Sequence, residues 1–298
     1  IAGKTGIGKF SIFWIGFCLS EGGKTEMAFM HVEFFSETLH MAVGAEVVLP
    51  QAAKVEIGID AKENRTGKHP VLWLLHGATD DQTTWSRRTS IERYASTMGL
   101  AIVMPSAHLS SYSNMAHGGS FYDYIAEELP AIMRDFFPLS DKREDNFIAG
   151  NSMGGFGSLK IGVNHPDRYG AIGCFSAGAS TGKPMGNRGG LFDEESYRMR
   201  DKMLHDGKDL SSTCEDTYFM AEKNKNLPNL PRIFHSCGAD DFLIGEAHRA
   251  RDFFQSMEGN PYHYVYEEHP GVHSWDYWDE HIMDFLRFLN LESVVQCN

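Results

Sequence analysis

The sequence predicts an α/β fold in which a mostly parallel central sheet carries helices on both faces. Two of its predicted strands, residues 70–75 and 100–104, are short apolar runs, which is typical of strands buried on both faces. Helical patterns separate these runs, and such alternation indicates a parallel sheet. The strands predicted for this sheet are residues 70–75, 100–104, 147–150, 171–176, 232–237 and 262–266.

Composition limits the function classes. The chain has 298 residues, of which 42% are hydrophobic, enough for a sizeable core. Its formal charge of −13 argues against nucleic-acid binding, which needs a basic face. The five cysteines are scattered and odd in number. A disulfide framework is therefore not expected, and a reducing, cytoplasmic compartment is predicted, with no membrane partner.

The remaining elements follow in chain order. Residues 28–35 and 41–49 predict an antiparallel hairpin. We expect one domain over residues 27–298, preceded by an extension (1–26) of uncertain origin, encoded by an expression vector or translated from upstream. An insertion at about 177–230 is expected to cover the active site like a short lid. Predicted helices are 85–98, 121–136, the stretch after the motif below to about 163, 245–257 and 274–289.

One motif organises the prediction of function. Residues 147–157 read FIAGNSMGGFG, a strand, a G-x-S-x-G turn and the start of a helix. This is the nucleophile elbow, which exposes a serine hydroxyl on a sharp turn for attack on a substrate. Gly150 and Gly154 leave room where a Cβ would clash, and Gly155 and Gly157 are expected to let the helix pack close to the sheet. Ser152 is the predicted nucleophile.

A second G-x-S-x-G match lies at residues 178–182 and contains Ser180. The sequence that follows it is rich in glycine and contains Pro184, so it cannot open a helix. Ser180 is therefore predicted to lie in a loop.

The acid and the base are expected on later loops. Ligands of α/β sheets bind at the carboxyl ends of strands, and the hydrolase fold uses the order Ser, Asp, His. Asp240 and Asp241 both follow a predicted strand, and their spacing leaves the choice between them open. His273 lies after Pro270 and Gly271, on a loop that can fold back over the elbow. His269, directly before that proline, is interpreted as structural.

An oxyanion hole needs two backbone N–H donors. The nucleophile elbow predicts Met153 as one donor and the turn after residues 70–75 as the other, with Ala78 favoured over Gly77. Catalysis by a metal is the competing class, with His76 and Asp80–Asp81, or His269 and His273, as possible ligands. No metal-binding spacing such as H-E-x-x-H occurs, so neither a metal nor a cofactor is predicted.

Beyond these motifs, the chain from Met27 to about Leu291 resembles the bacterial tributyrin esterase (EstA-like) group. This group is related to esterase D, also called S-formylglutathione hydrolase, within the α/β-hydrolase fold. The stretches that carry the resemblance are 74–77 (LLHG), 104–105 (MP), 128–130 (ELP), 137–138 (FP), 143–144 (RE), 147–157, 165–168 (HPDR), 237–243 (CGADDFL) and 271–275 (GVHSW).

The resemblance implies that Asp241, which precedes Phe-Leu, is the acid and that His273 is the base. It implies hydrolysis of short-chain acyl esters without a cofactor, in a cytoplasmic dimer or tetramer. Tributyrin, aryl esters and acetylated sugars are the expected substrates. An S-formylglutathione-type thioesterase or an acyltransferase is the alternative, although residues 76–84 lack the Thr-Cys expected of formylglutathione hydrolases. A third hypothesis is an inactive hydrolase fold used for binding.

The sequence says least about the substrate pocket. Four residues that flank the proposed site in sequence are candidates to line an acyl or alcohol pocket and bind substrate, but they could equally belong to the core. They are Tyr112, Phe242, Leu243 and Trp275.

Overall fold

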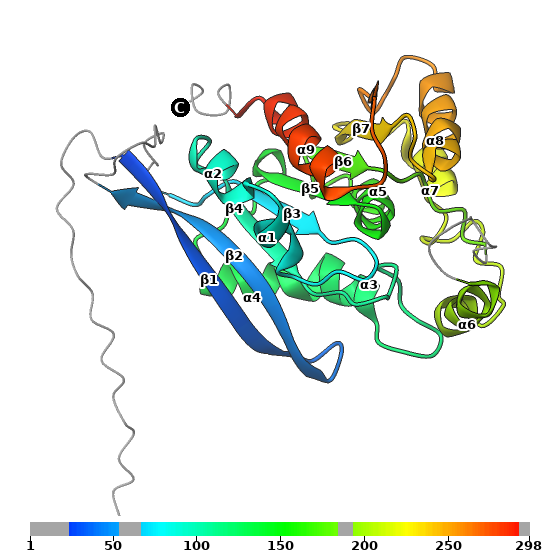
Figure 1. The fold of residues 1–298 in the computed structure, drawn as a ribbon, viewed down its shortest axis with the longest axis horizontal. Coiled ribbons are helices and arrows are strands. Elements are labelled where there is room, and N and C mark those ends of the chain that lie inside the picture. Colours follow the sequence, from blue (N-terminus) through cyan, green and yellow to red (C-terminus); the bar gives the residue numbers. More distant parts are fainter. Residues whose placement is uncertain (1–23, 54–66, 184–192, 292–298) are drawn as a thin grey trace, which may run out of the picture.

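A computed structural model describes residues 24–53, 67–183 and 193–291. Within these ranges eight strands form one sheet in the order β1-β2-β4-β3-β5-β6-β7-β8 (Figure 1). The pairs β1–β2 and β2–β4 are antiparallel, and all other neighbours are parallel, as predicted. The strands are β1 Lys24–Ser36, β2 Met41–Ala53, β3 Val71–Leu75, β4 Ala101–Pro105, β5 Asn146–Asn151, β6 Ala171–Phe175, β7 Arg232–Gly238 and β8 Val265–His269.

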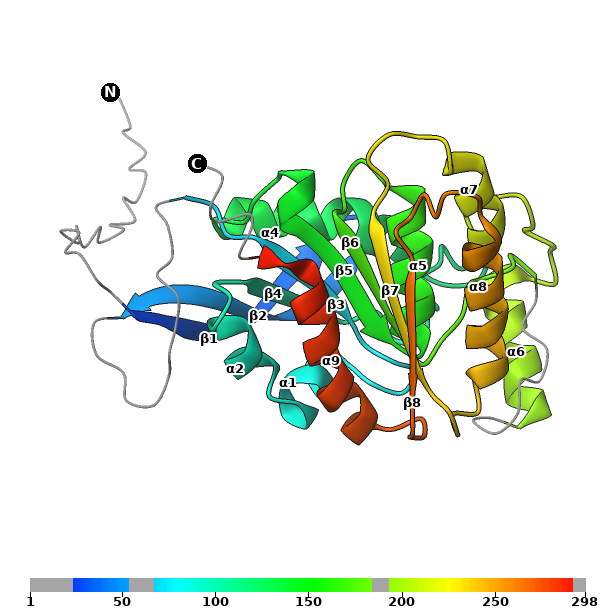
Figure 2. The ribbon, with the colours of Figure 1, turned by 90° about the horizontal axis from the view of Figure 1, so that it is seen from above.

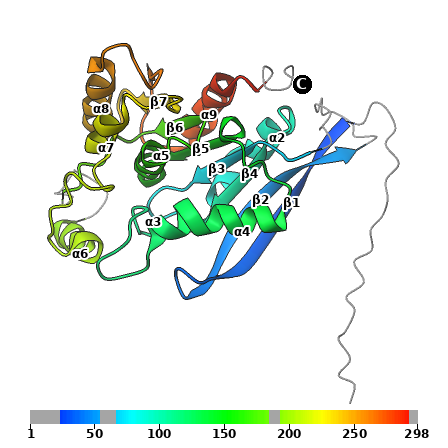
Figure 3. The ribbon, with the colours of Figure 1, turned by 180° about the vertical axis from the view of Figure 1, so that it is seen from behind.

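Helices cover both faces of the sheet (Figure 2). One face carries α1 Thr84–Arg88, α2 Ile91–Ser96 and α9 Trp275–Leu289. Figure 3 views the opposite face, on which α4 and α5 lie. The elements on that face are α3 Phe121–Asp123, a π-helical turn Tyr124–Glu128, α4 Leu129–Phe136, α5 Met153–Asn164, α7 Thr217–Asn224 and α8 Ile244–Ser256. A 3₁₀ turn, Arg143–Asp145, precedes β5.

Strand alternation divides the core in two. Successive side chains of a strand point to opposite faces, so a fully apolar strand supplies both cores. In β3, Val71, Trp73 and Leu75 pack beneath α4 and α5. Leu72 and Leu74 pack beneath α2 and α9. This is why the strand reads as a continuous apolar run.

The predicted helix at 121–136 is continuous but contains the π-helical turn before α4. Pro130 lacks the N–H that would bond to the carbonyl of Ala126 four residues earlier. The guanidinium of Arg168 donates to that carbonyl instead, at 2.9 Å. Glu128 accepts the backbone N–H groups of Glu37 and Thr38, which fixes the β1–β2 turn on this helix.

Two element predictions need correction. The helix predicted at 85–98 is divided into α1 and α2, because the Thr89 hydroxyl bonds to the Trp85 carbonyl and accepts from the Ile91 N–H. Such local side-chain bonds compete with the helix. The strand predicted at 262–266 begins three residues later. The side chain of Asn260 accepts the Tyr264 N–H, and this turn delays β8.

The insertion contains two helices in the described part of the chain. They are α6 Glu194–His205 and α7, and α6 lies beyond the carboxyl ends of the strands (Figure 1). Backbone N–H groups of Ala116 and His117 donate to the carbonyls of Leu204 and Met203, which joins the end of α6 to the loop after β4. Residues 184–192 lie outside the described ranges.

The boundary predicted at residue 26 falls inside β1, because Lys24 already pairs with Ala53. Residues 1–23 lie outside the described ranges. In the described part of the chain, no helix has the length and apolar character needed to cross a bilayer. Cys174, Cys214 and Cys237 are free thiols.

Gly154 gives a test of how closely the elbow approaches β3. A Cβ at residue 154 would lie 2.4 Å from the carbonyl oxygen of Leu75 and 2.8 Å from that of His76. We expect Gly154→Ala to lower the free energy of unfolding by about 3 kcal/mol, because backbone must move. Urea denaturation measures this loss. The control is Gly245→Ala in α8, which meets no atom within 4 Å and should stabilise the helix slightly.

Candidate active site

Ser152 sits at the tip of the predicted turn between β5 and α5. Its φ of 52° and ψ of −118° are strained values for a residue with a side chain. Strain of this kind persists where the surrounding structure holds the residue in place, often at functional sites. The Ser152 side chain makes no capping bond to α5, so its hydroxyl is not used by the helix.

The glycines around Ser152 act largely as predicted. A Cβ on Gly150 would lie 2.6 Å from the backbone of Gly154, and one on Gly155 would lie 2.9 Å from the Phe175 carbonyl of β6. Gly157 differs from the prediction, because it faces the ring of Tyr112 rather than the sheet.

Asp241 and His273 are brought together across the loops after β7 and β8. The Nδ1 of His273 lies 3.0 and 2.9 Å from the two carboxylate oxygens of Asp241. Asp241 is 2% exposed and also accepts the backbone N–H of Leu243. Burial raises the pKa of Asp241, but the bonds from His273 and Leu243 outweigh it and leave the pKa below its usual value. The carboxylate therefore remains ionised and orients the imidazole.

Asp240 differs from Asp241 in solvent exposure, because Asp240 is exposed and Asp241 is buried. Its side chain points to solvent, while its N–H donates to the Gly271 carbonyl and joins the two loops.

The His273 ring packs against Phe242 at 4.4 Å and Trp278 at 5.0 Å between centroids. No hydrogen bond connects Ser152 to His273 in this structure, and such bonds often tighten only when substrate binds.

The predicted oxyanion donors lie beside Ser152. Ala78 and Met153 line the same cavity as the serine. Met153 is the first residue of α5, so its N–H has no partner within the helix and lies at the positive end of the helix dipole. Gly77 lies against the serine, since a Cβ there would be 3.5 Å from the Ser152 Cβ.

His76 fixes the loop that carries these donors. Its Nε2 accepts the Ala107 N–H at 2.9 Å, so its Nδ1 carries the proton and donates to the Gly77 carbonyl at 2.7 Å. Burial lowers the pKa of His76 to about 4, which keeps the ring neutral. Because both ring nitrogens bond to backbone, His76 is not placed to bind a metal with Asp80 and Asp81.

Tyr112 supports this loop from behind. Its side chain is fully buried, and its hydroxyl donates to the His76 carbonyl at 2.9 Å. Ser111 and Tyr112 have φ values of 54° and 53°, so the loop after β4 is strained. The prediction that Tyr112 contacts substrate is therefore corrected, because its side chain does not line the cavity.

A narrow cavity of about 90 Å³ opens beside Ser152, between α5 and α6. Phe242 and Leu243 line it, as predicted, whereas Trp275 packs against Trp85 and Trp278 near the other core. Ser180 lies in a loop, as predicted, and also lines the cavity. The other lining residues are Ala78, Ser111, Ser113, Met153, Phe156, Lys160, Lys183, Tyr197, Arg200, Leu204, His205 and Glu215.

Lys160 and Glu215 form a buried ion pair in the cavity wall. The Lys160 Nζ donates to a Glu215 carboxylate oxygen at 2.7 Å, to the Ser113 hydroxyl at 2.7 Å and to the Ser111 carbonyl at 3.2 Å. These bonds attach the insertion and the strained loop to the nucleophile helix. Burial lowers the pKa of Lys160, and Glu215 opposes this change.

Sequence reasoning missed the ion pair and the lining residues of α6. A signal for Lys160 was present, since it lies two helical turns after Ser152 in a helix otherwise made of small, apolar and uncharged polar residues. No local signal identified Glu215 as its partner, because 55 residues separate the two.

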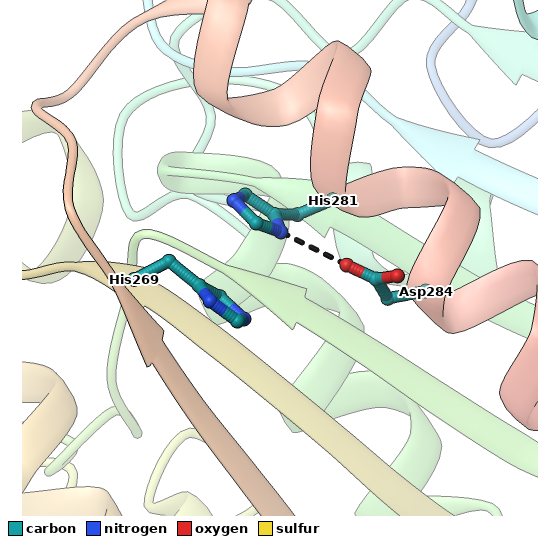
Figure 4. Close-up of side chains that lie close together, drawn as sticks. All are labelled: His269, His281 and Asp284. Carbon is teal, nitrogen blue, oxygen red and sulfur yellow. Dashed lines mark hydrogen bonds and ion pairs between the residues drawn. The ribbon is translucent and has the colours of Figure 1, made fainter.

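A second cluster, of His269, His281 and Asp284, has the residue types of a metal site (Figure 4). The His281 Nδ1 bonds to Asp284 at 2.9 Å, and the rings of His269 and His281 stack 4.3 Å apart at an angle of 9°. Nitrogen lone pairs lie in the ring plane, so two stacked rings do not direct them at one ion. This arrangement favours the structural role predicted for His269.

The fold and the site define a hydrolase of the α/β type. The chain belongs to an esterase family: the family model described as "Putative esterase" matches residues 36–289. The chain is therefore a carboxylic ester hydrolase.

Individual relatives agree with this assignment. The acetyl esterase of Caldicellulosiruptor saccharolyticus is 27% identical over 273 residues, covering 89% of this chain and 98% of the relative. Two Staphylococcus aureus structures are 30% identical, and each match covers 89% of this chain. Fluorophosphonate-binding serine hydrolase F has a TM-score of 0.73 with 98% of its chain covered, and S-formylglutathione hydrolase has 0.71 with 99% covered.

Tyr112→Phe tests whether Tyr112 supports the loop after β3, which carries the predicted oxyanion donor Ala78. Removing the hydroxyl leaves the His76 carbonyl without this donor, so the loop should shift and kcat for ester hydrolysis should fall about tenfold with little change in KM. The matched control is Tyr262→Phe, because Tyr262 is also buried and donates to a backbone carbonyl, that of Ala221, at 2.9 Å. Both variants should lose about 1 kcal/mol of stability. Equal kcat in both variants would contradict the role given to Tyr112.

Proposed function

We propose that this esterase hydrolyses short-chain acyl esters, with Ser152, His273 and Asp241 as its catalytic triad. The observation that carries the proposal is the contact between the buried Asp241 and the part-buried His273, which lies at the same edge of the sheet as the strained Ser152 turn. Met153 and Ala78 are proposed as oxyanion donors, with Gly77 as a less favoured alternative to Ala78. No metal or cofactor is needed for this chemistry.

The proposed reaction has two halves. His273 Nε2 takes the proton of Ser152 as the serine oxygen attacks the ester carbonyl, and the backbone N–H donors stabilise the oxyanion. The bond to the alcohol then breaks, and His273 returns the proton to the leaving oxygen. Water, deprotonated by His273, attacks the acyl-serine, and His273 returns this proton to the Ser152 oxygen as the bond to the acyl group breaks and the acid is released. Asp241 stays ionised throughout and stabilises the imidazolium.

The narrow cavity supports a small acyl group. Its volume of about 90 Å³ is below the range of about 300–1,000 Å³ typical of ligand pockets. Acetyl and butyryl groups, as in aryl acetates, acetylated sugars and tributyrin, are the proposed substrates. A cytoplasmic homodimer or homotetramer remains a prediction from the family resemblance.

A thioesterase or acyltransferase is the second candidate. The observation in its favour is the likeness to the S-formylglutathione hydrolase structure, at 30% identity. Thioesters would use the same acyl-serine intermediate, so the two candidates differ in the leaving group rather than in the catalytic residues.

A p-nitrophenyl ester series from acetate to octanoate tests the reaction and the acyl-chain preference. We expect kcat/KM to be highest at acetate or butyrate, because a longer alkyl chain would extend to the polar side chains of Lys160, His205 and Glu215 that line the same cavity. Ser152→Ala should lower kcat by about 10⁴-fold or more, since it removes the nucleophile. Release of p-nitrophenolate measures both effects.

The matched control is Ser180→Ala, which changes the other G-x-S-x-G serine. A fluorophosphonate should label the wild type and Ser180→Ala stoichiometrically, and it should not label Ser152→Ala. A folded wild-type protein that neither reacts with the fluorophosphonate nor hydrolyses any ester would support a binding protein instead.

The leaving-group preference separates the two candidate functions. We expect kcat/KM for p-nitrophenyl butyrate to exceed that for S-formylglutathione, because the loop after β3 lacks the Thr-Cys of formylglutathione hydrolases. Purified protein is assayed with both substrates at the same pH. A thioester preference of tenfold or more would replace the esterase proposal with the thioesterase.

A further inference from the structure

The cavity beside Ser152 ends in polar groups that ester hydrolysis itself does not use. Ser152, Phe156 and Lys160 follow one another at intervals of four residues, so they lie on one face of α5. Eight residues of helix span about 12 Å, and a long side chain on a helix points back toward its N-terminus. Lys160 therefore extends toward the serine and ends the cavity within reach of a medium-length chain.

The cavity lies on the acyl side of the nucleophile. Ser152, Ala78 and Met153 line it, whereas His273 lies outside its lining. His273 must protonate the leaving alcohol, so that alcohol has to lie on the His273 side. The acyl group is therefore assigned to the cavity between α5 and α6, whose lining includes Phe242 but not His273 itself.

His205 is the first polar group at the far end. It is the last residue of α6, is 7% exposed and lines the cavity within electrostatic range of Lys160 and Glu215. Its Nδ1 is buried and has no hydrogen-bond partner in the described part of the chain. Burial lowers the pKa of His205, so the neutral ring has one donor and one acceptor nitrogen.

Glu215 is the second polar group. Lys160 and Ser113 both donate to its Oε2, and no described residue donates to its Oε1. The three protons of the Lys160 ammonium are already used by Ser111, Ser113 and Glu215. Lys160 thus neutralises Glu215 but has no proton left for a carboxylate of the substrate.

We propose that this end of the cavity binds a hydroxyl group carried by the acyl chain, with Glu215 and His205 as its partners. The proposal rests on the esterase function proposed above. A hydroxyl can donate to Glu215 Oε1 and exchange a hydrogen bond with His205. A carboxylate would be repelled by Glu215, and an ammonium would meet Lys160. An alkyl end would leave the buried Nδ1 of His205 without a partner, which is costly.

Matched substrate pairs test the proposal directly. The two p-nitrophenyl esters of a pair differ at the far end of the acyl chain, where one carries a hydroxyl and the other a methyl group. The pairs are 6-hydroxyhexanoate with heptanoate and 8-hydroxyoctanoate with nonanoate. We expect the hydroxyl member of at least one pair to have a kcat/KM about tenfold higher or more. A ratio near one in all pairs would overturn the proposal.

A variant then locates the hydroxyl partner. In His205→Leu, the kcat/KM for a hydroxyl ester divided by the kcat/KM for its methyl partner should fall to about one or below. The ratio is taken within one protein, so a general loss of activity cancels. His248→Leu makes the same substitution on α8, outside the cavity, and should keep the wild-type ratio. An unchanged ratio in His205→Leu would overturn the assignment of this residue.

Turnover of p-nitrophenyl acetate separates the two proposals, because an acetyl group is too short to reach His205. Hydrolysis of acetate without any hydroxyl preference refutes the hydroxyl subsite alone. No hydrolysis of acetate, with the protein folded, refutes the esterase proposal on which it rests.

Discussion

The close approach of the nucleophile turn to the end of β3 is the constraint on which the site depends. The Leu75 carbonyl lies so near residue 154 that only glycine fits there. The same carbonyl accepts the indole N–H of Trp85, which joins α1 to β3. This contact places the start of α5 beside the loop after β3, and the two proposed oxyanion donors come from these two segments. Chemistry and packing are thus set by one backbone contact.

Around this contact, hydrogen bonds between backbone and side chains hold the loops in place. His76 and Tyr112 tie the loop after β3 to the loop after β4. Lys160 ties that second loop to α5 and to the insertion. Breaking one partner of a buried ion pair costs about 3–5 kcal/mol, so this link stabilises the fold and shapes the cavity together.

The sheet and the triad candidates were predictable because their signals are local. Buried strands such as β3 and β4 are continuous apolar runs, and Ser152 lies in a motif with a fixed strand–turn–helix setting. The choice of Asp241 over Asp240 needed the family resemblance, and the structure supports it through contact with His273. Tyr112, Glu215 and His205 could not be placed from sequence, because their roles depend on contacts between distant segments. The start of β8 was missed because the side chain of Asn260, rather than the pattern of aromatic residues, decides where the turn ends.

The position of α6 has an evolutionary consequence. This helix supplies one wall of the cavity and contributes none of the groups proposed to move protons. Mutations on its inner face can therefore change which esters are accepted while the reaction steps stay intact. Selection for hydrolysis of a different ester would act on this wall first. The residues proposed for catalysis, which the sheet positions, would stay the same. Divergence of substrate range within one conserved chemistry is the expected history of such an enzyme.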